Sequence, residues 1–176
     1  NALSDLSHPC QAISDMYTLK ENFGSINNLN IVWMGDMNNV LFSLLEVISF
    51  TKNTKVDVFT DEAIYSLNKD NFNINDNINF HFNIKEEIIA KANCVMTDVF
   101  TSMNDKEDKE NLLSKFQVND DIMSITDKKS VFMHCLPAKI GSEVSEDVIK
   151  GEKSIVLAQA RNRLVSQKGI LKWLSI

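Results

Sequence analysis

The sequence predicts a doubly wound α/β fold, in which helices cover both faces of a mostly parallel sheet. Two observations predict it: short apolar runs of strand length recur along the chain, and segments of helical periodicity separate them. Parallel neighbours need helical crossovers, and those helices bury both faces of the sheet. The size agrees, because 176 residues with 44% hydrophobic and 24% charged residues suit one globular domain with an added terminal helix.

The first three predicted elements open the alternation of strands and helices. Residues 9–23 carry apolar side chains at helical spacing, and Gly24 is a natural end for that helix. Residues 30–35 are a short apolar run that ends at glycine, which indicates a buried strand. An apolar helix is expected over residues 40–50, so that strand, tight turn and helix form the start of a βαβ unit.

The same alternation continues to the end of the chain. Five further strands are predicted, over residues 55–60, 78–82, 94–97, 130–135 and 154–157. Five further helices are predicted, over residues 62–67 (capped by Asp61), 84–90, 106–116, 143–150 and 160–174. The asparagine-rich residues 71–79 are expected in a surface loop.

Composition and charge argue against several classes of protein. The net charge of -6 disfavours a duplex nucleic-acid binder, which normally carries a basic patch. No run approaches the roughly 18 to 20 apolar residues that cross a bilayer, so no membrane span is expected. The cysteines (Cys10, Cys94 and Cys135) form no disulfide framework, which favours a reducing, cytoplasmic environment. The chain begins without methionine or a signal sequence, and we expect it to start within a longer protein.

Polar clusters follow four of the predicted strands, at the carboxyl ends where doubly wound sheets bind ligands. These clusters are Gly35-Asp-Met-Asn-Asn39, Asp98-Val-Phe-Thr-Ser-Met103, His134-Cys-Leu-Pro137 and Arg161-Asn-Arg163. Each also has a purely structural interpretation. Asn and Asp favour turns and helix caps, a lone arginine is usually solvated or salt-bridged, and adjacent strand residues such as a His–Cys pair point to opposite faces.

Neither a metal nor a dinucleotide cofactor is expected. The histidines and cysteines lack the ligand spacing of a structural zinc site, and His8-x-Cys10 is the nearest approach to one. The turn after the first strand lacks G-x-G-x-x-G, so its backbone is not suited to a pyrophosphate. These absences disfavour a nicotinamide or flavin enzyme.

Four motifs in order resemble the signature of the ornithine carbamoyltransferases: His8-Pro-Cys-Gln11, Gly35-Asp-Met-Asn-Asn39, Asp98-Val-Phe-Thr-Ser-Met103 and His134-Cys-Leu-Pro137. The end of the chain, with Arg161-Asn-Arg163 and Leu171-Lys-Trp-Leu174, is similar to the closing helix of that family. One departure stands in this segment, since the family usually has Ala-Glu-Asn-Arg where this chain has Ala160-Arg-Asn-Arg163. The reversed charge at Arg161 weakens the assignment of Arg163.

The resemblance implies transfer of a carbamoyl group from carbamoyl phosphate to the side-chain amine of L-ornithine, giving citrulline and phosphate. Family subunits have two α/β domains and assemble as homotrimers. The Ser-x-Arg-Thr phosphate loop of the first domain does not occur in this sequence. The resemblance therefore implies an ornithine-binding second domain, with residues 1–24 and 160–176 as helices that pack on an absent carbamoyl phosphate domain. Such a fragment alone is expected to be inactive.

The resemblance also implies roles for individual residues. Cys135, His8 and Arg163 would be catalytic, with no metal and no covalent intermediate. Contacts to carbamoyl phosphate would come from His8, Pro9, Cys10, Gln11, Cys135, Leu136 and Arg163. Ornithine would be bound by Asn39, Asp98, Ser102 and Met103.

Two alternatives stay open at the level of the sequence. One is a carbamoyltransferase for aspartate, acetylornithine or putrescine; His134-Cys-Leu-Pro in place of His-Pro-Leu-Pro, together with Asp98, Ser102 and Met103, favours ornithine. The other is a non-catalytic α/β domain that binds an amino acid or a partner, which the missing phosphate loop would explain.

Overall fold

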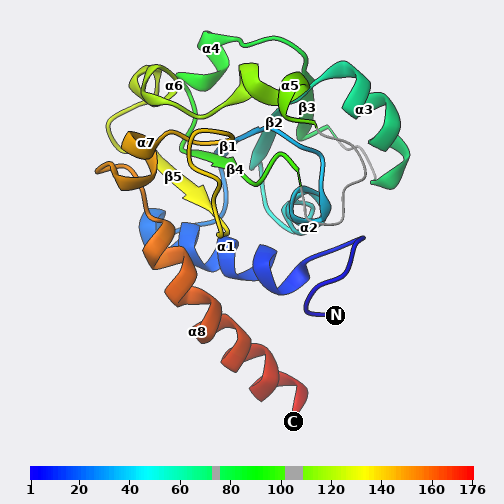
Figure 1. Ribbon diagram of the computed structural model, residues 1–176. Coiled ribbons are helices and arrows are strands. Elements are labelled where there is room, and N and C mark those ends of the chain that lie inside the picture. Colours follow the sequence, from blue (N-terminus) through cyan, green and yellow to red (C-terminus); the bar gives the residue numbers. More distant parts are fainter. Residues whose placement is uncertain (73–75, 102–108) are drawn as a thin grey trace.

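A five-stranded sheet forms the centre of the computed structural model, which describes residues 1–72, 76–101 and 109–176 (Figure 1). All neighbouring strands are parallel, and their order is β3-β2-β1-β4-β5. The strands are β1 (Asn30–Met34), β2 (Lys55–Phe59), β3 (Ile78–His81), β4 (Cys94–Thr97) and β5 (Val131–His134). The predicted doubly wound α/β class is confirmed.

Helices connect the strands and cover the sheet. They are α1 (Pro9–Phe23), α2 (Asn39–Ile48), α3 (Glu62–Asn68), α4 (Glu86–Ile89), α5 (Glu110–Leu113), α6 (Asp120–Ile125), α7 (Glu146–Lys150) and α8 (Val156–Leu174), with short 3-10 turns η1 (Lys69–Asn71) and η2 (Ser114–Phe116). Helix α1 packs against both α2 and α8, whereas α6 packs against α4 and α7 (Figure 1). The second half of α8 extends away from the body of the molecule. Within the described ranges, no helix has the length and apolar character needed to span a bilayer.

Local sequence explains where the two helices nearest the site begin and end. Pro9 starts α1, where its missing N–H leaves no hydrogen bond unmade. Gly24 ends it in the left-handed conformation, at φ 77°, and its N–H donates to the Lys20 carbonyl. Asn38 caps α2, because its side-chain oxygen accepts hydrogen bonds from the N–H groups of Val40 and Leu41.

The core lies on both faces of the central strands. Every residue of β4 and β5 is buried, as expected of parallel strands covered by helices on both sides. Large side chains that are at most 1% exposed fill the space between sheet and helices, namely Trp33, Phe59, Phe100, Phe116 and Phe132. The Trp33 indole N–H donates to the Asp36 carbonyl at 2.9 Å, so its one polar atom is satisfied.

The strand order reverses between β1 and β4. From β1 the chain builds β2 and β3 on one side, and then crosses over to build β4 and β5 on the other. In sheets of this kind a crevice opens at the carboxyl ends of the strands that flank the reversal. The segments that follow β1, β4 and β5 therefore come together at one edge of the sheet.

The predicted strand over residues 154–157 is wrong. Only Ser154 pairs with Phe132, as an isolated bridge, and α8 already begins at Val156. A single pair of hydrogen bonds to Phe132 holds this segment before the backbone turns into the helix. The early start of α8 brings Gln159 to the buried side of that helix.

Three further corrections concern the helices that follow β4. The helix α6 was not predicted, although Asn119 followed by two aspartates is a typical helix start. The helix predicted over residues 143–150 begins only at Glu146, and Glu143 lies before it with no exposed surface. Of the helix predicted over residues 106–116, residues 106–108 lie outside the described residues, and the rest consists of α5 and η2.

Candidate active site

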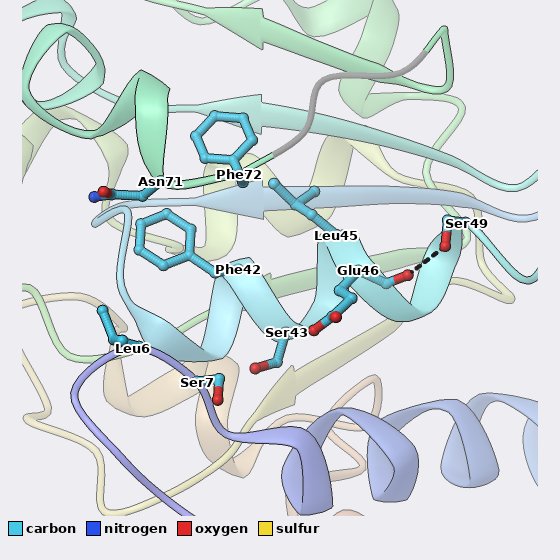
Figure 2. Close-up of a pocket in the computed structure, with 9 residues that line it drawn as sticks. All are labelled: Leu6, Ser7, Phe42, Ser43, Leu45, Glu46, Ser49, Asn71 and Phe72. Atoms are coloured by element: carbon cyan, nitrogen blue, oxygen red, sulfur yellow. Dashed lines mark hydrogen bonds between the residues drawn. The ribbon is translucent and has the colours of Figure 1, made fainter.

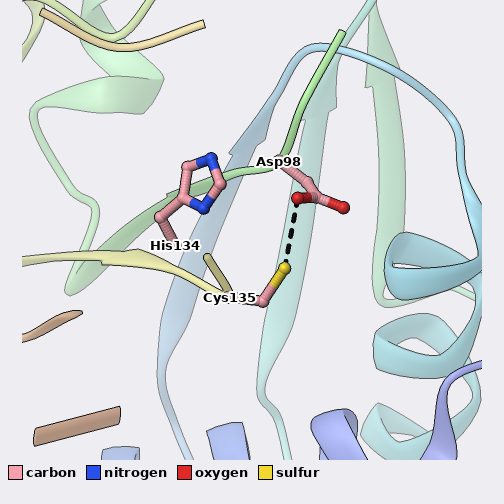
Figure 3. A group of neighbouring side chains, drawn as sticks. All are labelled: Asp98, His134 and Cys135. Atoms are coloured by element: carbon pink, nitrogen blue, oxygen red, sulfur yellow. Dashed lines mark hydrogen bonds between the residues drawn. The ribbon is translucent and has the colours of Figure 1, made fainter. Parts of the chain in front are cut away.

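Asp98 lies at the centre of a polar cluster at the carboxyl edge of the sheet (Figure 3). It follows β4 directly and is 7% exposed. One carboxyl oxygen accepts a hydrogen bond from the Asn38 side-chain amide at 2.7 Å, and the other accepts from the Cys135 thiol at 3.1 Å. The cluster therefore joins the ends of β1, β4 and β5, where three of the four family-like motifs lie.

Gly35 allows the end of β1 to approach β4 this closely. Its φ of +125° is a conformation that residues with side chains rarely adopt. A Cβ at this position would lie 2.7 Å from the Phe100 ring and 3.3 Å from the Thr97 hydroxyl. The turn that presents Asn38 to Asp98 thus needs glycine for both conformation and space.

Cys135 is held as a neutral thiol. Burial raises the pKa of the Cys135 thiol well above its ordinary value, and the negative charge of Asp98 and the hydrogen bond to it raise the pKa further. Arg163 acts in the opposite direction but does not outweigh these effects. Because the thiolate is the nucleophilic form, Cys135 is poorly suited to covalent catalysis at neutral pH.

His134 does not activate Cys135. The backbone N–H of Leu136 donates to His134 Nδ1 at 2.9 Å, so this nitrogen carries no proton and its lone pair is occupied. His134 Nε2 lies 3.1 Å from Glu143 Oε1, and neither side chain is exposed. The ring is therefore fixed on both sides, and its role is to hold the strand end and the Glu143 segment together.

Asp98, His134 and Cys135 bring one ligand atom each within 4.8 Å of one another, so their spacing could hold a metal ion. Their chemistry does not favour this. A metal would have to displace a hydrogen bond at either ring nitrogen of His134 and deprotonate a thiol whose pKa is raised. The donor set fits a hydrogen-bonded cluster better than a metal centre.

Alkylation of the cysteines tests the state of Cys135. We expect iodoacetamide to modify Cys135 slowly below pH 9, because the raised pKa leaves little thiolate. Replacing Asp98 with asparagine removes the negative charge, lowers the thiol pKa and should speed the modification several-fold at a given pH. Peptide mass spectrometry gives both rates, with the half-buried Cys10 as an internal control. Equal rates for Cys135 in the two proteins would contradict this assignment.

His8 enters the same region from the start of α1. Its backbone N–H donates to the Ser43 hydroxyl at 2.7 Å, and that hydroxyl donates to the Asn39 carbonyl at 2.9 Å. Burial lowers the pKa of the His8 imidazole and is the largest effect on it. A hydrogen bond to the Ala2 backbone acts in the opposite direction, and the weaker effect of the Arg163 charge lowers the pKa further. His8 is therefore a neutral imidazole near pH 7, tied to α2 through Ser43.

A second polar network lies behind the site, between α1 and α8. One carboxyl oxygen of Asp15 accepts hydrogen bonds from the side-chain amides of Gln11 and Gln159, each at 2.8 Å. All three side chains are at most 1% exposed. Burial raises the pKa of Asp15 to about 7, although both amide hydrogen bonds act to lower it.

Arg163 lies within α8, as the predicted closing helix requires, but no strand precedes it, so the expectation that Arg161-Asn-Arg163 follows a strand is wrong. The guanidinium is half-buried, and its charge acts on His8, Asp15 and Cys135. No hydrogen bond or ion pair joins it to another residue in the described ranges. Arg161, by contrast, is exposed and acts on Tyr17, so the unusual positive charge points away from the cluster.

Asn39 lies beside the cluster rather than in it. Its side-chain amide donates to the Ser4 carbonyl at 2.6 Å, in the N-terminal segment. It lines a cavity of about 380 Å³ together with Asp36 and Lys109, which form an ion pair at 3.0 Å. Its neighbour Asn38 makes the contact to Asp98 instead.

The remaining predicted site residues lie in the first turn of α1, next to Cys135, or outside the described residues. Pro9 and Cys10 are half-buried in the first turn of α1, where the Cys10 thiol is 3.8 Å from the Asn1 carbonyl. Leu136 is half-buried next to Cys135 and has a positive φ of 58°. Ser102 and Met103 lie outside the described residues. All these roles stay predictions.

A cavity of about 300 Å³ lies between the N-terminal segment and α2 (Figure 2). Phe42 and Phe72 stack at its side with ring centroids 5.7 Å apart. Glu46 is the one charged residue in its described lining. A zwitterionic amino acid needs groups of both signs, so this cavity is a poorer candidate site than the cluster around Asp98.

Sequence reasoning missed four residues that the structure brings to the site: Asn38, Asp15, Gln159 and Glu143. Asn38 belonged to a recognised motif, but only its neighbour was chosen. Asp15 lies four residues after Gln11, a spacing that places both on one helix face. No local signal marks Gln159 or Glu143, because their partners are distant in sequence or lie across a loop.

Comparisons with known proteins identify the family of this chain. The family model described as "Aspartate/ornithine carbamoyltransferase, Asp/Orn binding domain" matches residues 27–174. An ornithine carbamoyltransferase of Rhodopseudomonas palustris is 40% identical, over 98% of this chain and 57% of its own. The chain thus spans a little over half the length of such relatives.

Solved structures lead to the same family. The ornithine carbamoyltransferase of Thermus thermophilus superposes with a TM-score of 0.82 at 38% identity, over 97% of this chain and 56% of that one. The enzyme of Burkholderia thailandensis superposes with a TM-score of 0.87 at 29% identity, over 99% and 57%. The chain therefore belongs to the aspartate/ornithine carbamoyltransferase family, of which it matches the Asp/Orn-binding domain.

Proposed function

We propose that this chain is the amino-acid-binding half of an enzyme that transfers the carbamoyl group of carbamoyl phosphate to the side-chain amine of L-ornithine. The products are L-citrulline and phosphate. The observation that carries the proposal is the position of Asp98, a buried carboxylate held between Asn38 and Cys135 at the reversal of the strand order. A buried negative charge of this kind is suited to an ammonium group.

The amino acid would be bound through both of its head groups. Asp98 accepts hydrogen bonds only, which suits the α-ammonium, and Asn39 supplies a neutral amide donor for the α-carboxylate. The Asn39 amide would exchange its bond to the Ser4 carbonyl for one to the ligand. In this proposal Ser102 and Met103 complete the pocket.

The carbamoyl phosphate would lie beside the first turn of α1, within reach of Arg163 on α8. The half-buried guanidinium of Arg163 has no ion-pair partner among the described residues, and it suits an anionic phosphate. His8, as a neutral imidazole, can donate to the carbamoyl oxygen without adding a positive charge. Pro9 and Cys10 belong to the same first turn of α1, and Leu136 adjoins the site beside Cys135.

The reaction needs a neutral amine, because an ammonium has no lone pair. The amine nitrogen attacks the carbamoyl carbon, a tetrahedral intermediate forms, and the C–O bond to phosphate breaks; the departing phosphate takes the amine proton. Donors aimed at the developing oxyanion stabilise this intermediate. Alignment of the two reactants can lower the barrier by up to roughly 7 to 11 kcal/mol. Cys135, as a neutral thiol, lies beside the reacting groups without bonding covalently to them.

The rest of the enzyme would come from the part of the relatives that this chain does not match. We propose that this part is a carbamoyl phosphate domain, on which α1 and α8 pack, and that the complete enzyme is a cytoplasmic homotrimer. The exposed apolar side chains of α8 support such packing, among them Leu164, Leu171 and Trp173, which are 58%, 68% and 74% exposed. The free cysteines fit a reducing compartment.

Substrate preference tests the proposal. The chain is fused to the part of the Rhodopseudomonas palustris relative that it does not match, and a colour assay for the ureido group follows carbamoyl transfer. Ornithine should react roughly 100-fold better than aspartate, acetylornithine or putrescine. Acetylornithine has its α-amine blocked and putrescine has no carboxylate, so each loses a head group that the site binds, whereas aspartate has no side-chain amine to accept the carbamoyl group. The 176-residue chain alone should show negligible turnover.

Two outcomes would count against the proposal. A fusion that prefers aspartate would assign the chain to another member of the same family. A folded fusion without any turnover, together with no heat of ornithine binding in the presence of carbamoyl phosphate, would favour a non-catalytic domain.

A further inference from the structure

Asp15 is a buried carboxyl group to which the reaction above assigns no role. It lies in the middle of α1 and has no exposed surface. Only one of its oxygens has hydrogen-bond partners among the described residues, and these are the amides of Gln11 and Gln159. Because burying a carboxyl group is costly unless it is well bonded, a buried carboxyl without a structural ion pair points to function.

The two glutamines connect Asp15 to both sides of the candidate site. Gln11 belongs to the motif that would contact the carbamoyl group. Gln159 accepts a hydrogen bond from the backbone N–H of His134 at 2.9 Å, one residue before Cys135. A single carboxyl oxygen thus links α1, α8 and the end of β5, which are far apart in sequence.

The carboxylate also decides which way each amide points. A side-chain amide has a donating end and an accepting end, whereas a carboxylate only accepts. Both glutamines therefore turn their NH₂ groups to Asp15. The Gln159 carbonyl then faces the His134 N–H, and the Gln11 carbonyl is turned away from Asp15. This oxygen of Gln11 is buried and has no partner among the described residues.

We propose that Asp15 is a positioning residue for carbamoyl transfer, which holds the Gln11 carbonyl oxygen ready to accept the N–H groups of the carbamoyl moiety and fixes the strand end that carries Cys135. The inference rests on the proposed function, because it is the carbamoyl group that supplies those N–H donors. Asp15 itself does not touch the substrate. Its effect passes through Gln11 on one side and through Gln159 on the other.

Protonation of Asp15 would loosen this arrangement. A protonated carboxyl can donate as well as accept, so the Gln11 amide could turn its carbonyl toward Asp15 instead. The pKa of Asp15, raised to about 7 by burial, places this change near neutral pH. The ionisable groups that act on it are Asp98, which raises the pKa, and Arg163, which lowers it; the thiols of Cys94 and Cys135 also feel its charge. The Gln11 amide should therefore be held in the required orientation above about pH 7, where Asp15 is ionised.

Kinetics of Asp15→Asn in the fusion enzyme test the inference. A displaced catalytic group can lower the rate on the order of 100-fold, and we expect a loss of that size in kcat. The KM for ornithine should change by less than about twofold, because Asp15 does not act on the amino-acid pocket. The part of the acidic limb of the kcat–pH profile that titrates near pH 7 should also disappear, since asparagine does not titrate, whereas the part set by deprotonation of the ornithine amine should remain.

Asn162→Ala is the matched control. Asn162 is buried in the same contact between α1 and α8, where its amide donates to Thr18 at 3.1 Å and to Glu21 at 2.6 Å. It has no hydrogen bond to Gln11, Asp15 or Gln159. This variant should lower the melting temperature and leave kcat nearly unchanged. If Asp15→Asn and Asn162→Ala show equal decreases in melting temperature and equal decreases in kcat, Asp15 has only a structural role and the inference is wrong.

A spectroscopic measurement on the 176-residue chain separates this inference from the proposed function. In ¹H–¹⁵N spectra the side-chain NH₂ signals of Gln11 and Gln159 should exchange slowly with solvent at pH 8, and they should shift together near pH 7. Asp15→Asn should abolish that shift. Signals that do not move between pH 5.5 and 8.5 would overturn the inference, even if the fusion makes citrulline. Signals that move as expected would support the positioning by Asp15, even if the fusion proved inactive.

Discussion

Replacing Asp98 with asparagine should nearly abolish the use of ornithine by the fusion enzyme. The side chains are alike in size, but asparagine has no charge and turns an NH₂ group toward one of the two donors that Asp98 now accepts from. Loss of a buried charged partner costs about 2 to 5 kcal/mol of binding, which corresponds to a decrease of roughly 30-fold to several thousand-fold in kcat/KM for ornithine. Steady-state kinetics with varied ornithine at saturating carbamoyl phosphate measure this decrease in kcat/KM.

The control for this substitution is Asp57→Asn. Asp57 lies in β2 and pairs with His81 of β3 at 2.7 Å, away from the residues assigned to the site. Its side chain is 14% exposed, so it is also a largely buried, hydrogen-bonded aspartate. This variant should lose some stability and keep its kcat/KM. An Asp98→Asn enzyme that keeps its KM for ornithine would refute the role of Asp98 in binding the ammonium group.

Gly35→Ala should destabilise the fold by roughly 2 to 6 kcal/mol. A non-glycine residue held at an unfavourable positive φ costs about 1 to 3 kcal/mol. The added Cβ, 2.7 Å from the Phe100 ring, forces a shift in a packed core, which costs about 1 to 3 kcal/mol more. Since domains are stable by only about 5 to 15 kcal/mol, urea denaturation should reveal this loss clearly.

Gly169→Ala is the matched control, and it should raise the stability of the fold where Gly35→Ala lowers it. Gly169 lies inside α8, and nothing is within 4 Å of the position its Cβ would occupy. Alanine favours an exposed helix interior over glycine by about 0.5 to 1 kcal/mol, so this variant should be slightly more stable. Equal urea midpoints for Gly35→Ala and the unsubstituted protein would mean that the turn after β1 tolerates a side chain.

The stability effect at Gly35 and the binding effect at Asp98 have a common origin. Parallel strands that end at the same edge leave little room between the segments that follow them. The turn after β1 fits only because Gly35 has no side chain, and this brings Asn38 within 2.7 Å of Asp98. If Gly35→Ala still folds, the displaced turn should also move Asn38 away from Asp98. That variant should therefore bind ornithine more weakly.

Burial shifts several groups of the site in the same direction. The pKa of His8 falls while those of Asp15 and Cys135 rise, so each favours its neutral form. Exclusion of water is the first cause in all three cases. A region from which water is excluded interacts strongly with the charges of a bound substrate, because low polarity and the absence of water reduce screening.

Local pattern was enough to predict the fold class and most elements of this protein. Apolar runs of strand length and helical periodicity are signals carried by adjacent residues, so β1, α1 and the cap at Asp61 could be predicted from them. The prediction failed at residues 154–157, where the apolar run Ile155-Val-Leu157 has the composition of a strand. There the pairing with β5 ends after one residue and helix α8 forms against α1. The choice between strand and helix depended on packing partners outside the segment.

The ordered motifs alone indicated the family and the residues to consider around Asp98 and Cys135. Only the tertiary structure decided that Asn38 rather than Asn39 contacts Asp98, that His134 is fixed by Glu143, and that Asp15 joins Gln11 to Gln159. The last of these contacts spans 144 positions in the sequence. Hydrogen bonds between distant segments depend on how the chain crosses over and packs, and no pattern of neighbouring residues records that.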